Sequence, residues 1–504
     1  MTSPSPVIRR LSAAIAAIVA GVTLTACSSA IAGTASTDAS TVSVTSTATS
    51  ATTALADNVA SHAESGDLAY DADAAVTITL ADGASTSSST SGVAIDGDTV
   101  TISAAGTYVL SGTLSDGRIV VASDADGTVK LVLDNASVTS SSGSAFVITA
   151  ADEAVVVLAD GTSNSLADGT GYDTSADDAP NAALFSMADL TIGGAGSLTV
   201  TGNTNDGIAG KDGLVIQGGT ITVTAVDDGI RGKDYLIVED ATVGVDAKDD
   251  ALKSDNEADD TVGYVLIKSG TVTLAAGDDG IHAEGDLAIQ GGKVTVSTSN
   301  EGLEGSTVTI AGGDTSVTST DDGLNATQGS TTDSAAAGGG GGMQSDGSLL
   351  TISGGTLLVN AQGDGLDSNG SLVITGGTTV VSGPTTSGNG ALDSNGGITM
   401  SGGTLVAAGS SGMAEAPSTD STTGWVSVTF AQAIAAGETV SIVKDGTVIA
   451  AYTTVKQVSS LIVANSDITS GQTYDVYVGG TLSGTAVGTY SDSGDLSGAT
   501  KNTT

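Results

Sequence analysis

The residues best suited to do chemistry in this chain are carboxylates that recur in short motifs at a regular spacing. In most copies the acid is followed by glycine, as in Asp228-Gly229, and a last copy reads Asn389-Gly390. The acidic positions are Asp206, Asp228, Asp250, Asp279, Glu301, Asp322 and Asp364. Carboxylate oxygens gathered in one place are the ligands that Ca²⁺ prefers, because this ion accepts about six to eight oxygen atoms.

A second series lies three positions after the first and changes from basic to acidic along the chain. Its members are Ala209, Arg231, Lys253, His282, Glu304, Asn325, Asp367 and Asp393. Arg231 and Lys253 can neutralise nearby carboxylates, whereas Asp367 and Asp393 add negative charge and join the seven acids above as candidate metal ligands. His282 is expected to be solvated or stacked, because His62 is the only other histidine and a zinc site is therefore not expected.

The spacing of the motifs predicts the element that must position them. Successive acids lie 22, 22, 29, 22, 21 and 42 residues apart. A unit such as 213–234 contains an apolar run, a Gly-Gly pair, an alternating run of Thr, Ile and Val, and the acidic motif. Three short strands and their turns fit about 22 residues, which is one coil of a parallel β-helix. The longer steps hold insertions at 256–261 and in a glycine-rich segment, 328–347, which we expect to be flexible.

Stacked coils would place the acids of successive motifs over one another at the strand spacing of about 4.8 Å. Two like charges at that distance repel by about 1 kcal/mol in water and about 3.5 kcal/mol at an effective dielectric constant of 20. Bound Ca²⁺ would relieve this repulsion, and the glycine after each acid would permit a tight turn that directs carbonyl groups towards the ion. The alternative is that the acids are solvated on exposed turns, because Asp-Gly is a common turn pair.

The same stacking predicts an all-β fold with a ladder of aliphatic side chains in its core. One inward-facing column is expected to contain Ile216, Ile289, Ile310, Ile352, Ile374 and Met400. Such ladders account for a core with few aromatic side chains, which make up 3% of the chain. A β-sandwich is the alternative, although it would use larger and less periodic side chains.

Composition excludes several other classes of protein. The chain has 504 residues, with 71 Gly, 5 Pro and a net charge of −43. So much glycine is incompatible with a long helical protein, and collagen would need more proline and a three-residue period. A nucleic-acid-binding protein needs a basic surface, so nucleic acid is not an expected partner. The hydrophobic share of 39%, arranged in short alternating runs, is too high for a fully disordered chain.

The N-terminal residues have the pattern of an export signal. Two arginines precede a short apolar run, and Leu-Thr-Ala-Cys ends at Cys27, the only cysteine. This pattern resembles a bacterial lipobox, so we expect residues 1–26 to be a lipoprotein signal peptide and Cys27 to be lipidated. An ordinary signal peptide is the alternative. Residues 27–68 are rich in Ser, Thr and Ala and are expected to form a tether, with a low-complexity strand region as the alternative. The expected location is the bacterial cell membrane, facing the extracellular side.

The rest of the chain divides into a repeat region and a different C-terminal part. The β-helix is expected over 69–410, followed by a linker over 411–424. Residues 425–492 lack the repeat and are expected to form a small β-module or cap, with a hairpin turn at 444–447. Residues 493–504 are expected to be a disordered tail.

Several of these motifs together resemble a known family. They are the Gly-Thr-Tyr-Val-Leu-Ser-Gly segment at 106–112, the strand at 129–135, the turns at 205–208 and 227–234, and the glycine-rich insertion. The chain resembles, from about residue 73 to 480, the carbohydrate-binding domain-containing β-helix family of pectate-lyase-like, polysaccharide-binding lipoproteins. The resemblance implies a right-handed parallel β-helix, a surface-anchored binder of polysaccharide, and calcium held by the acidic turns.

We expect a monomeric, non-catalytic protein that binds extracellular polysaccharide through a calcium-stabilised β-helix. Acidic glycans are favoured, because one Trp and nine Tyr offer few stacking platforms for neutral sugars. A polysaccharide lyase is one alternative, in which Arg231 or Lys253 would act as the base. A structural adhesin or spacer is another, and the sequence does not separate it from the binding protein.

Overall fold

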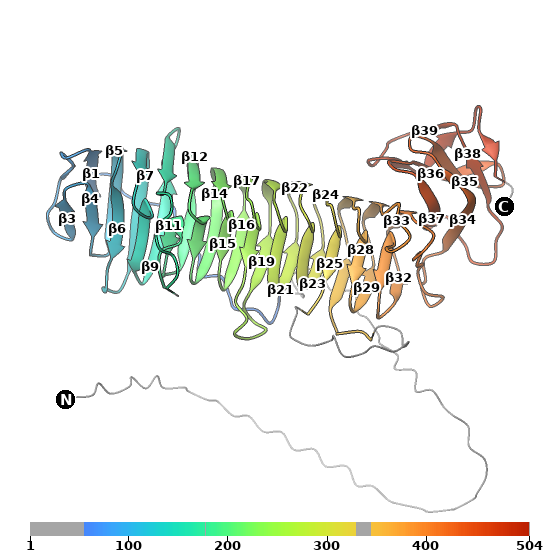
Figure 1. Ribbon diagram of the computed structural model, residues 1–504, viewed down its shortest axis with the longest axis horizontal. Coiled ribbons are helices and arrows are strands. Elements are labelled where there is room, and N and C mark those ends of the chain that lie inside the picture. Colours follow the sequence, from blue (N-terminus) through green and yellow to red (C-terminus); the bar gives the residue numbers. More distant parts are fainter. Residues whose placement is uncertain (1–54, 177, 329–343, 503–504) are drawn as a thin grey trace, which may run out of the picture. The chain divides into compact units, whose positions relative to one another are not determined.

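The computed structural model describes residues 55–176, 178–328 and 344–502, and these residues belong to one compact unit. They form β-strands and turns without a helix, and most strands are parallel members of one 35-stranded sheet (Figure 1). The predicted all-β class is therefore confirmed. Within these ranges no helix is long and apolar enough to cross a membrane. The predicted signal peptide, Cys27 and the tether up to residue 54 lie outside the described residues, as does 329–343 of the glycine-rich insertion.

Parallel pairing joins each strand to strands one repeat before and after it, in three series that we call the parallel stack. The first series consists of β4 (Thr99–Ile102), β6 (Arg118–Ala122), β8 (Phe146–Ala150), β11 (Ala182–Ser186), β13 (Asp206–Gly210), β15 (Ile230–Gly232), β18 (Leu252–Ser254), β21 (Ile281–Ile289), β23 (Leu303–Ile310), β25 (Leu324–Ala326), β28 (Leu366–Ser368) and β31 (Leu392–Ser394).

The second series adjoins the first through the long strands β21 and β23. It contains these two strands together with β1 (Val76–Ala81), β5 (Gly106–Leu114), β7 (Thr128–Thr139), β9 (Glu153–Leu158), β12 (Leu190–Gly202), β14 (Gly213–Ala225), β16 (Tyr235–Glu239), β19 (Tyr264–Ile267), β26 (Leu349–Ile352), β29 (Ser371–Ile374) and β32 (Ile398–Met400).

The third series shares β5, β7, β12 and β14 with the second. Its other strands are β10 (Ser163–Ala167), β17 (Ala241–Asp246), β20 (Gly270–Ala275), β22 (Lys293–Thr298), β24 (Asp314–Thr318), β27 (Thr356–Asn360), β30 (Thr378–Ser382) and β33 (Thr404–Gly409). At the N-terminal end, β2 (Thr86–Ser87) and β3 (Val93–Asp96) pair antiparallel with β1 and β4. This pattern is consistent with the predicted parallel β-helix.

The core of the stack is a set of aliphatic ladders. All six members of the predicted inward column are fully buried, and the register inserts Val238 and Ile267 between Ile216 and Ile289. Each buried side chain therefore packs on its equivalent in the next repeat. Because burial of apolar surface stabilises by about 25 cal/mol per Å², these continuous ladders hold the strands together with few aromatic residues.

Residues 55–68, the last part of the predicted tether, pack against the stack. The N–H of Val59 donates to the carbonyl of Thr261 at 2.8 Å, and the hydroxyl of Tyr264 donates to the carbonyl of Val59 at 3.0 Å. Leu68 packs on a buried cluster of valines from β7 and β9. The tether prediction therefore does not hold for 55–68, because this segment covers apolar side chains on the outer side of the second series.

The C-terminal residues form antiparallel strands joined to the last strand of the stack. β37 (Val458–Ala464) pairs antiparallel with both β33 and β34 (Trp425–Ile434). A second sheet contains β35 (Thr439–Lys444), β36 (Thr447–Thr453), β38 (Asp475–Val478), β40 (Tyr490–Ser491) and β42 (Thr500–Lys501), and a third pairs β39 (Thr481–Ser483) with β41 (Ser493–Asp495). The predicted hairpin at 444–447 joins β35 and β36. Residues 493–501, predicted to be disordered, instead form β41 and β42, because their backbone groups pair with β39 and β38.

Candidate functional site

The seven predicted acids occupy equivalent positions in successive repeats, and we call them the acidic column. The N–H of Gly207 donates to the carbonyl of Asp228 at 3.0 Å, that of Gly229 to Asp250 at 2.8 Å, and that of Gly323 to Asp364 at 2.8 Å. The register on which the sequence argument depends is therefore confirmed. At the last repeat, Gly390 rather than Asn389 takes the equivalent position, because Gly365 N–H donates to the Gly390 carbonyl.

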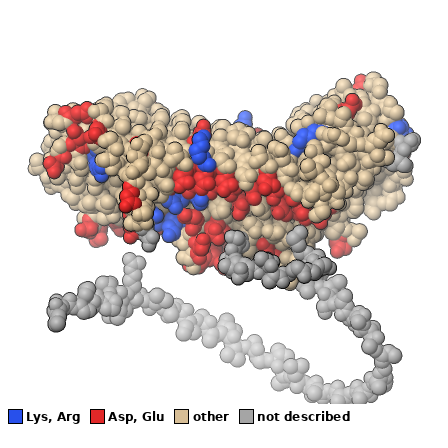
Figure 2. All heavy atoms as spheres, viewed as in Figure 1, with Lys and Arg blue, Asp and Glu red and all other residues tan. Residues whose placement is uncertain are grey.

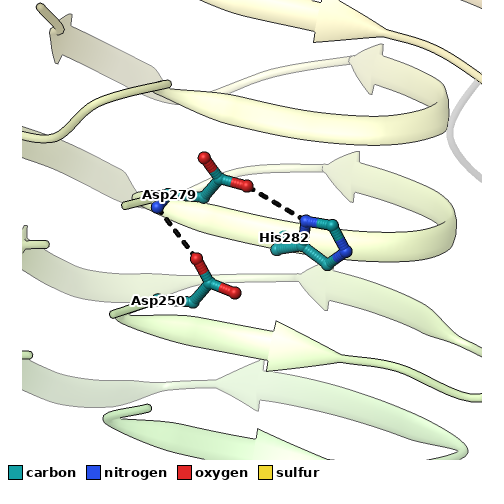
Figure 3. A group of neighbouring side chains, drawn as sticks. All are labelled: Asp250, Asp279 and His282. Carbon is teal, nitrogen blue, oxygen red and sulfur yellow. Dashed lines mark hydrogen bonds and ion pairs between the residues drawn. The ribbon is translucent and has the colours of Figure 1, made fainter. Parts of the chain in front are cut away.

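Several carboxylates of the acidic column also accept a backbone hydrogen bond from the next repeat. Oδ1 of Asp250 accepts the N–H of Asp279 at 2.9 Å (Figure 3). Oδ1 of Asp228 accepts the N–H of Asp250 at 3.3 Å, and Oδ1 of Asp364 accepts the N–H of Gly390 at 2.5 Å. Since one oxygen of each carboxylate is held in this way, the side chains are fixed along the column, and the second oxygen remains for other partners.

The glycine of the motif does not have the role that the sequence suggested. The carbonyl groups of the acids accept hydrogen bonds from the neighbouring repeat, so they are directed along the stack. A Cβ atom at Gly229 would overlap Cγ1 of Val245, and one at Gly302 would overlap Cγ1 of Val317. Close packing between series therefore favours glycine at these positions, whereas the copy at Asp250 accommodates Ala251.

The second predicted series also stacks in register, and we call it the mixed column. Pairing runs from Ala209 through Arg231, Lys253, His282, Glu304, Asn325 and Asp367 to Asp393. Because it lies on the first series beside the acidic column, each of its side chains can reach carboxylates of its own and the adjacent repeat.

Both basic members of the mixed column, Arg231 and Lys253, form ion pairs with acids. Arg231 Nη2 lies 2.8 Å from Asp206 Oδ2, and its Nη1 lies 3.0 Å from Asp255 Oδ2. Lys253 Nζ lies 2.7 Å from Asp250 Oδ2 and 3.3 Å from Asp228 Oδ1. These pairs neutralise the N-terminal half of the acidic column.

The same ion pairs bear on the lyase alternative. Burial alone would lower the pKa of Arg231 and of Lys253, but the surrounding carboxylates outweigh it and raise both pKa values. A base must give up its proton before it can accept one, so this environment favours ion pairing over proton abstraction.

His282 lies between the N-terminal half of the site, where Arg231 and Lys253 neutralise the acids, and the C-terminal half, where the acids have no such partner among the described residues. Its Nδ1 lies 3.0 Å from Asp279 Oδ2, and Figure 3 shows the imidazole turned towards that carboxylate. Burial alone would lower the pKa of His282, but the bond to Asp279 and the charges of Asp250 and Glu304 raise it to about 9. The expected solvated or stacked histidine is instead an ion-pair partner within the site.

The C-terminal half of the site lacks cationic partners. Among the described residues, no Lys, Arg or His lies within ion-pair distance of Asp322, Asp364, Asp367 or Asp393. Burial, followed by repulsion from Asp322 and Asp393, raises the pKa of Asp367 to about 8. Burial and the neighbouring Asp364 likewise raise the pKa of Asp322 to about 7, although an N–H bond from Asp364 opposes this. Figure 2 shows acidic side chains gathered in a band along one face.

Sequence reasoning missed several acids that extend the site. Asp227, Asp249 and Asp278 precede members of the acidic column, and their carboxylates lie beside it. The repeated Asp-Asp pairs were a signal that could have found them. Glu415, in the predicted linker, accepts the N–H of Ser394 at 3.1 Å, and its pKa is raised by burial and by Asp393. Nothing in the repeat pattern pointed to Glu415.

The arrangement contains groups of ligands close enough to hold a metal ion. In each of four groups the ligand atoms lie within 4.8 Å of one another; these are Asp250, Asp279 and His282; Asp227, Asp228 and Asp249; Asp249, Asp250 and Asp278; and Asp279, Glu301 and Glu304. Next to the last group, Asn325 Nδ2 donates to Glu301 Oε2 at 2.9 Å, while its buried Oδ1 has no hydrogen-bond partner. Oxygen donors of this kind, one of them an unpaired buried amide, fit a hard cation such as Ca²⁺.

Comparisons with known proteins identify the family to which the chain belongs. The family model of the carbohydrate-binding domain-containing protein matches residues 96–347. A protein of that description from Acetivibrio thermocellus is 41% identical over 208 residues, which cover 41% of this chain and 73% of the relative. A solved structure described as the polysaccharide lyase-like protein from C. thermocellum, a gadolinium derivative, is 30% identical, with a TM-score of 0.43 over 48% of this chain and 93% of that one. The family resemblance suggested by the sequence is thus confirmed, and the chain belongs to the carbohydrate-binding domain-containing protein family.

Proposed function

We propose that this protein binds extracellular polysaccharide, without catalysis, along the face of a parallel β-helix of about 22 residues per coil. The observation that carries the proposal is the uncompensated half of the acidic column, which spans several repeats without a cation among the described residues. Family membership supports carbohydrate as the ligand class.

Calcium is the cofactor that we propose for this face. The candidate ligands are Asp206, Asp228, Asp250, Asp279, Glu301, Asp322, Asp364, Asp367 and Asp393, to which the structure adds Glu304, Glu415 and Asn325 Oδ1. The strongest are those without a cationic partner among the described residues, namely Glu301, Asp322, Asp364, Asp367, Asp393 and Glu415, whereas Glu304 lies 4.0 Å from His282 Nδ1. Bound Ca²⁺ would neutralise the column and supply a bridge to carboxylates of an acidic glycan.

Charge determines which glycans fit such a face. With 57 acids against 14 bases, the chain repels polyuronates at long range unless cations intervene. The protein's own contribution is a rigid row of carboxylates at the repeat spacing, which suits an extended anionic chain. We therefore propose acidic polysaccharides, with galacturonate polymers as the first to test.

We also propose that the protein is exported and held at the outer side of the bacterial cell membrane by lipid on Cys27. The support is the sequence pattern of the first 27 residues. Acyl chains bind membranes by about 0.8 kcal/mol per buried CH₂ group, so two or more chains would give stable anchoring.

The proposed function is tested with the part of the chain that follows Cys27 (residues 28–504), which we call the secreted part. Its binding to polygalacturonate is measured in Ca²⁺ and in chelator. We expect binding in Ca²⁺, loss of it in chelator, and weaker binding of Asp367→Asn in Ca²⁺. Asp246→Asn is the matched control, because it removes the same charge from an exposed position on β17. Undiminished binding in chelator would exclude the calcium bridge, and absence of binding in either condition would exclude acidic glycans as ligands.

A further inference from the structure

A cavity lies far along the chain from the acidic column, where the C-terminal strands meet the end of the stack. Its volume is about 640 Å³, within the range of about 300–1,000 Å³ typical of small-molecule sites. It lies outside residues 96–347, which the family model matches. We propose that this cavity, which we call the Trp425 cleft, is a binding site for a neutral saccharide.

One wall of the Trp425 cleft is the segment that leads into β34. The N–H of Ser418 donates to the carbonyl of Ile398 at 2.8 Å, and the N–H of Thr423 donates to the carbonyl of Met400 at 3.1 Å. Residues 418–423 are thereby fixed on β32 as a further layer. A wall whose two ends are held by backbone hydrogen bonds is pre-organised. This reduces the loss of conformational entropy when a ligand binds.

The opposite wall is the loop between β37 and β38. The hydroxyl of Tyr474 accepts the N–H of Thr469 at 2.7 Å, so the end of the loop is tied to its middle. A Cβ atom at Gly424 would overlap the carbonyl oxygen of Ile468, which shows that the two walls touch closely beside the cavity. The shape of the cleft is therefore fixed by contacts within and between its two walls.

The lining combines uncharged hydrogen-bonding groups with aromatic rings. The lining residues are Thr419, Ser421, Thr422, Thr423, Ser466, Thr469, Ser470 and Gln472, together with Trp425, Tyr474 and four small or aliphatic residues. None of these described lining residues carries a charge. Trp425 is the only tryptophan of the chain, and its ring packs partly against the core.

This chemistry selects a neutral sugar among the classes of ligand that a cavity of this size can hold. Hydroxyl and amide side chains can both donate to and accept from sugar hydroxyls, and an aromatic face packs against the C–H groups of a pyranose ring. A uronate or a phosphate would find no cationic group in the lining, and a purely apolar ligand would leave the hydroxyl groups unpaired. The uncharged lining of the cleft thus favours a neutral ligand, whereas the carboxylates of the acidic column favour cations.

The position of Trp425 provides a direct readout, because all tryptophan fluorescence of the protein comes from this cleft. The secreted part is titrated, in chelator, with cellohexaose, xylohexaose and maltohexaose, and with a galacturonate oligomer for comparison. We expect a saturable change in emission with at least one neutral series and none with the galacturonate oligomer. Binding in chelator separates this site from the calcium-dependent one, so each proposal can fail alone.

Variants assign the binding to the cleft. Gln472→Ala and Thr422→Val alter exposed lining side chains and should weaken the neutral ligand about five- to tenfold each. Gln432→Ala, at an exposed position on β34 that does not line the cleft, is the matched control and should leave the affinity unchanged. No saturable response to any neutral series, checked by calorimetry, would overturn the proposal, as would equal affinity of all three variants.

Discussion

The backbone N–H of Asp364 donates a 2.6 Å hydrogen bond to Oδ1 of Asp322, although the two residues are 42 positions apart. The same contact joins Asp279 to Asp250 across 29 positions and Asp250 to Asp228 across 22. The column therefore keeps one register whatever length of chain lies between two repeats. Insertions extend away from the stack and do not change its register, so the carboxylates of successive repeats stay in one line.

The stability of the protein in chelator should fall as pH rises. Burial and neighbouring carboxylates raise the pKa of Asp367 to about 8 and that of Asp322 to about 7, against about 3.9 in an unfolded chain. A raised folded-state pKa means that the folded protein holds the proton more tightly, so this contribution to stability is complete below pH 4 and is lost as pH rises through 7 to 8.

We expect the thermal midpoint in chelator to decrease by about 2 °C or more between pH 5 and pH 8, measured by circular dichroism. His282, whose pKa is raised to about 9, acts in the same direction at higher pH. Saturating Ca²⁺ serves as the control and should abolish the decrease, because it keeps the carboxylates ionised in the folded state. A midpoint that rises over this range in chelator would contradict the assignment of repulsion to the column.

A lysine at position 367 should replace the cation that this half of the site lacks. Lys253 occupies the equivalent position four repeats earlier in the mixed column and bridges Asp250 and Asp228. Asp367→Lys should therefore raise the thermal midpoint in chelator and shrink the further gain produced by Ca²⁺. Asp314→Lys, an exposed change of the same charge on β24, is the control and should leave the Ca²⁺ gain intact. An unchanged Ca²⁺ gain in Asp367→Lys would place the ion elsewhere.

Removing the Arg231 guanidinium should destabilise the protein strongly. Asp206 is 1% exposed and would be left without its 2.8 Å partner, so Arg231→Met should cost about 3 kcal/mol in urea denaturation. The double variant Arg231→Met with Asp206→Asn should recover part of this loss, since the buried charge is removed with its partner. Lys248→Met breaks an exposed pair with Asp246 and should change stability by less than about 1 kcal/mol. A double variant no more stable than Arg231→Met would contradict this explanation.

The segment 55–68 should detach when its histidine anchor is removed. His62 Nδ1 lies 2.7 Å from the hydroxyl of Tyr235 and 3.2 Å from Asp189 Oδ1, and Nε2 lies 3.0 Å from Thr191 Oγ1. His62→Leu breaks these contacts, and we expect faster limited proteolysis within the segment, equivalent to a local loss of about 1–2 kcal/mol. Ser65→Ala, an exposed change in the same segment that leaves the histidine contacts in place, should be cleaved at the wild-type rate. Equal protection of both variants would show that apolar packing alone holds the segment.

The sequence by itself determined the class of fold and the membership of both columns. Periodicity did this, because in a parallel stack a residue and its equivalent in the next repeat must be neighbours. The buried ladder from Ile216 to Met400 and the pairing from Arg231 to Asp393 were both readable in this way. The family resemblance rested on two of the acidic turns together with segments outside the repeat pattern, such as 106–112 and 129–135.

Only the tertiary structure decided which parts outside the repeat take part in the molecule's surfaces. Glu415 joins the acidic site, 55–68 covers an apolar strip, and the Trp425 cleft forms between segments more than 40 residues apart in sequence. These contacts do not recur at a fixed spacing, so the repeat pattern of the sequence does not predict them. The sequence also did not show how the charges of the acids are neutralised. Arg231 and Lys253 each reach acids in two repeats, and this depends on side-chain geometry that the register alone does not specify.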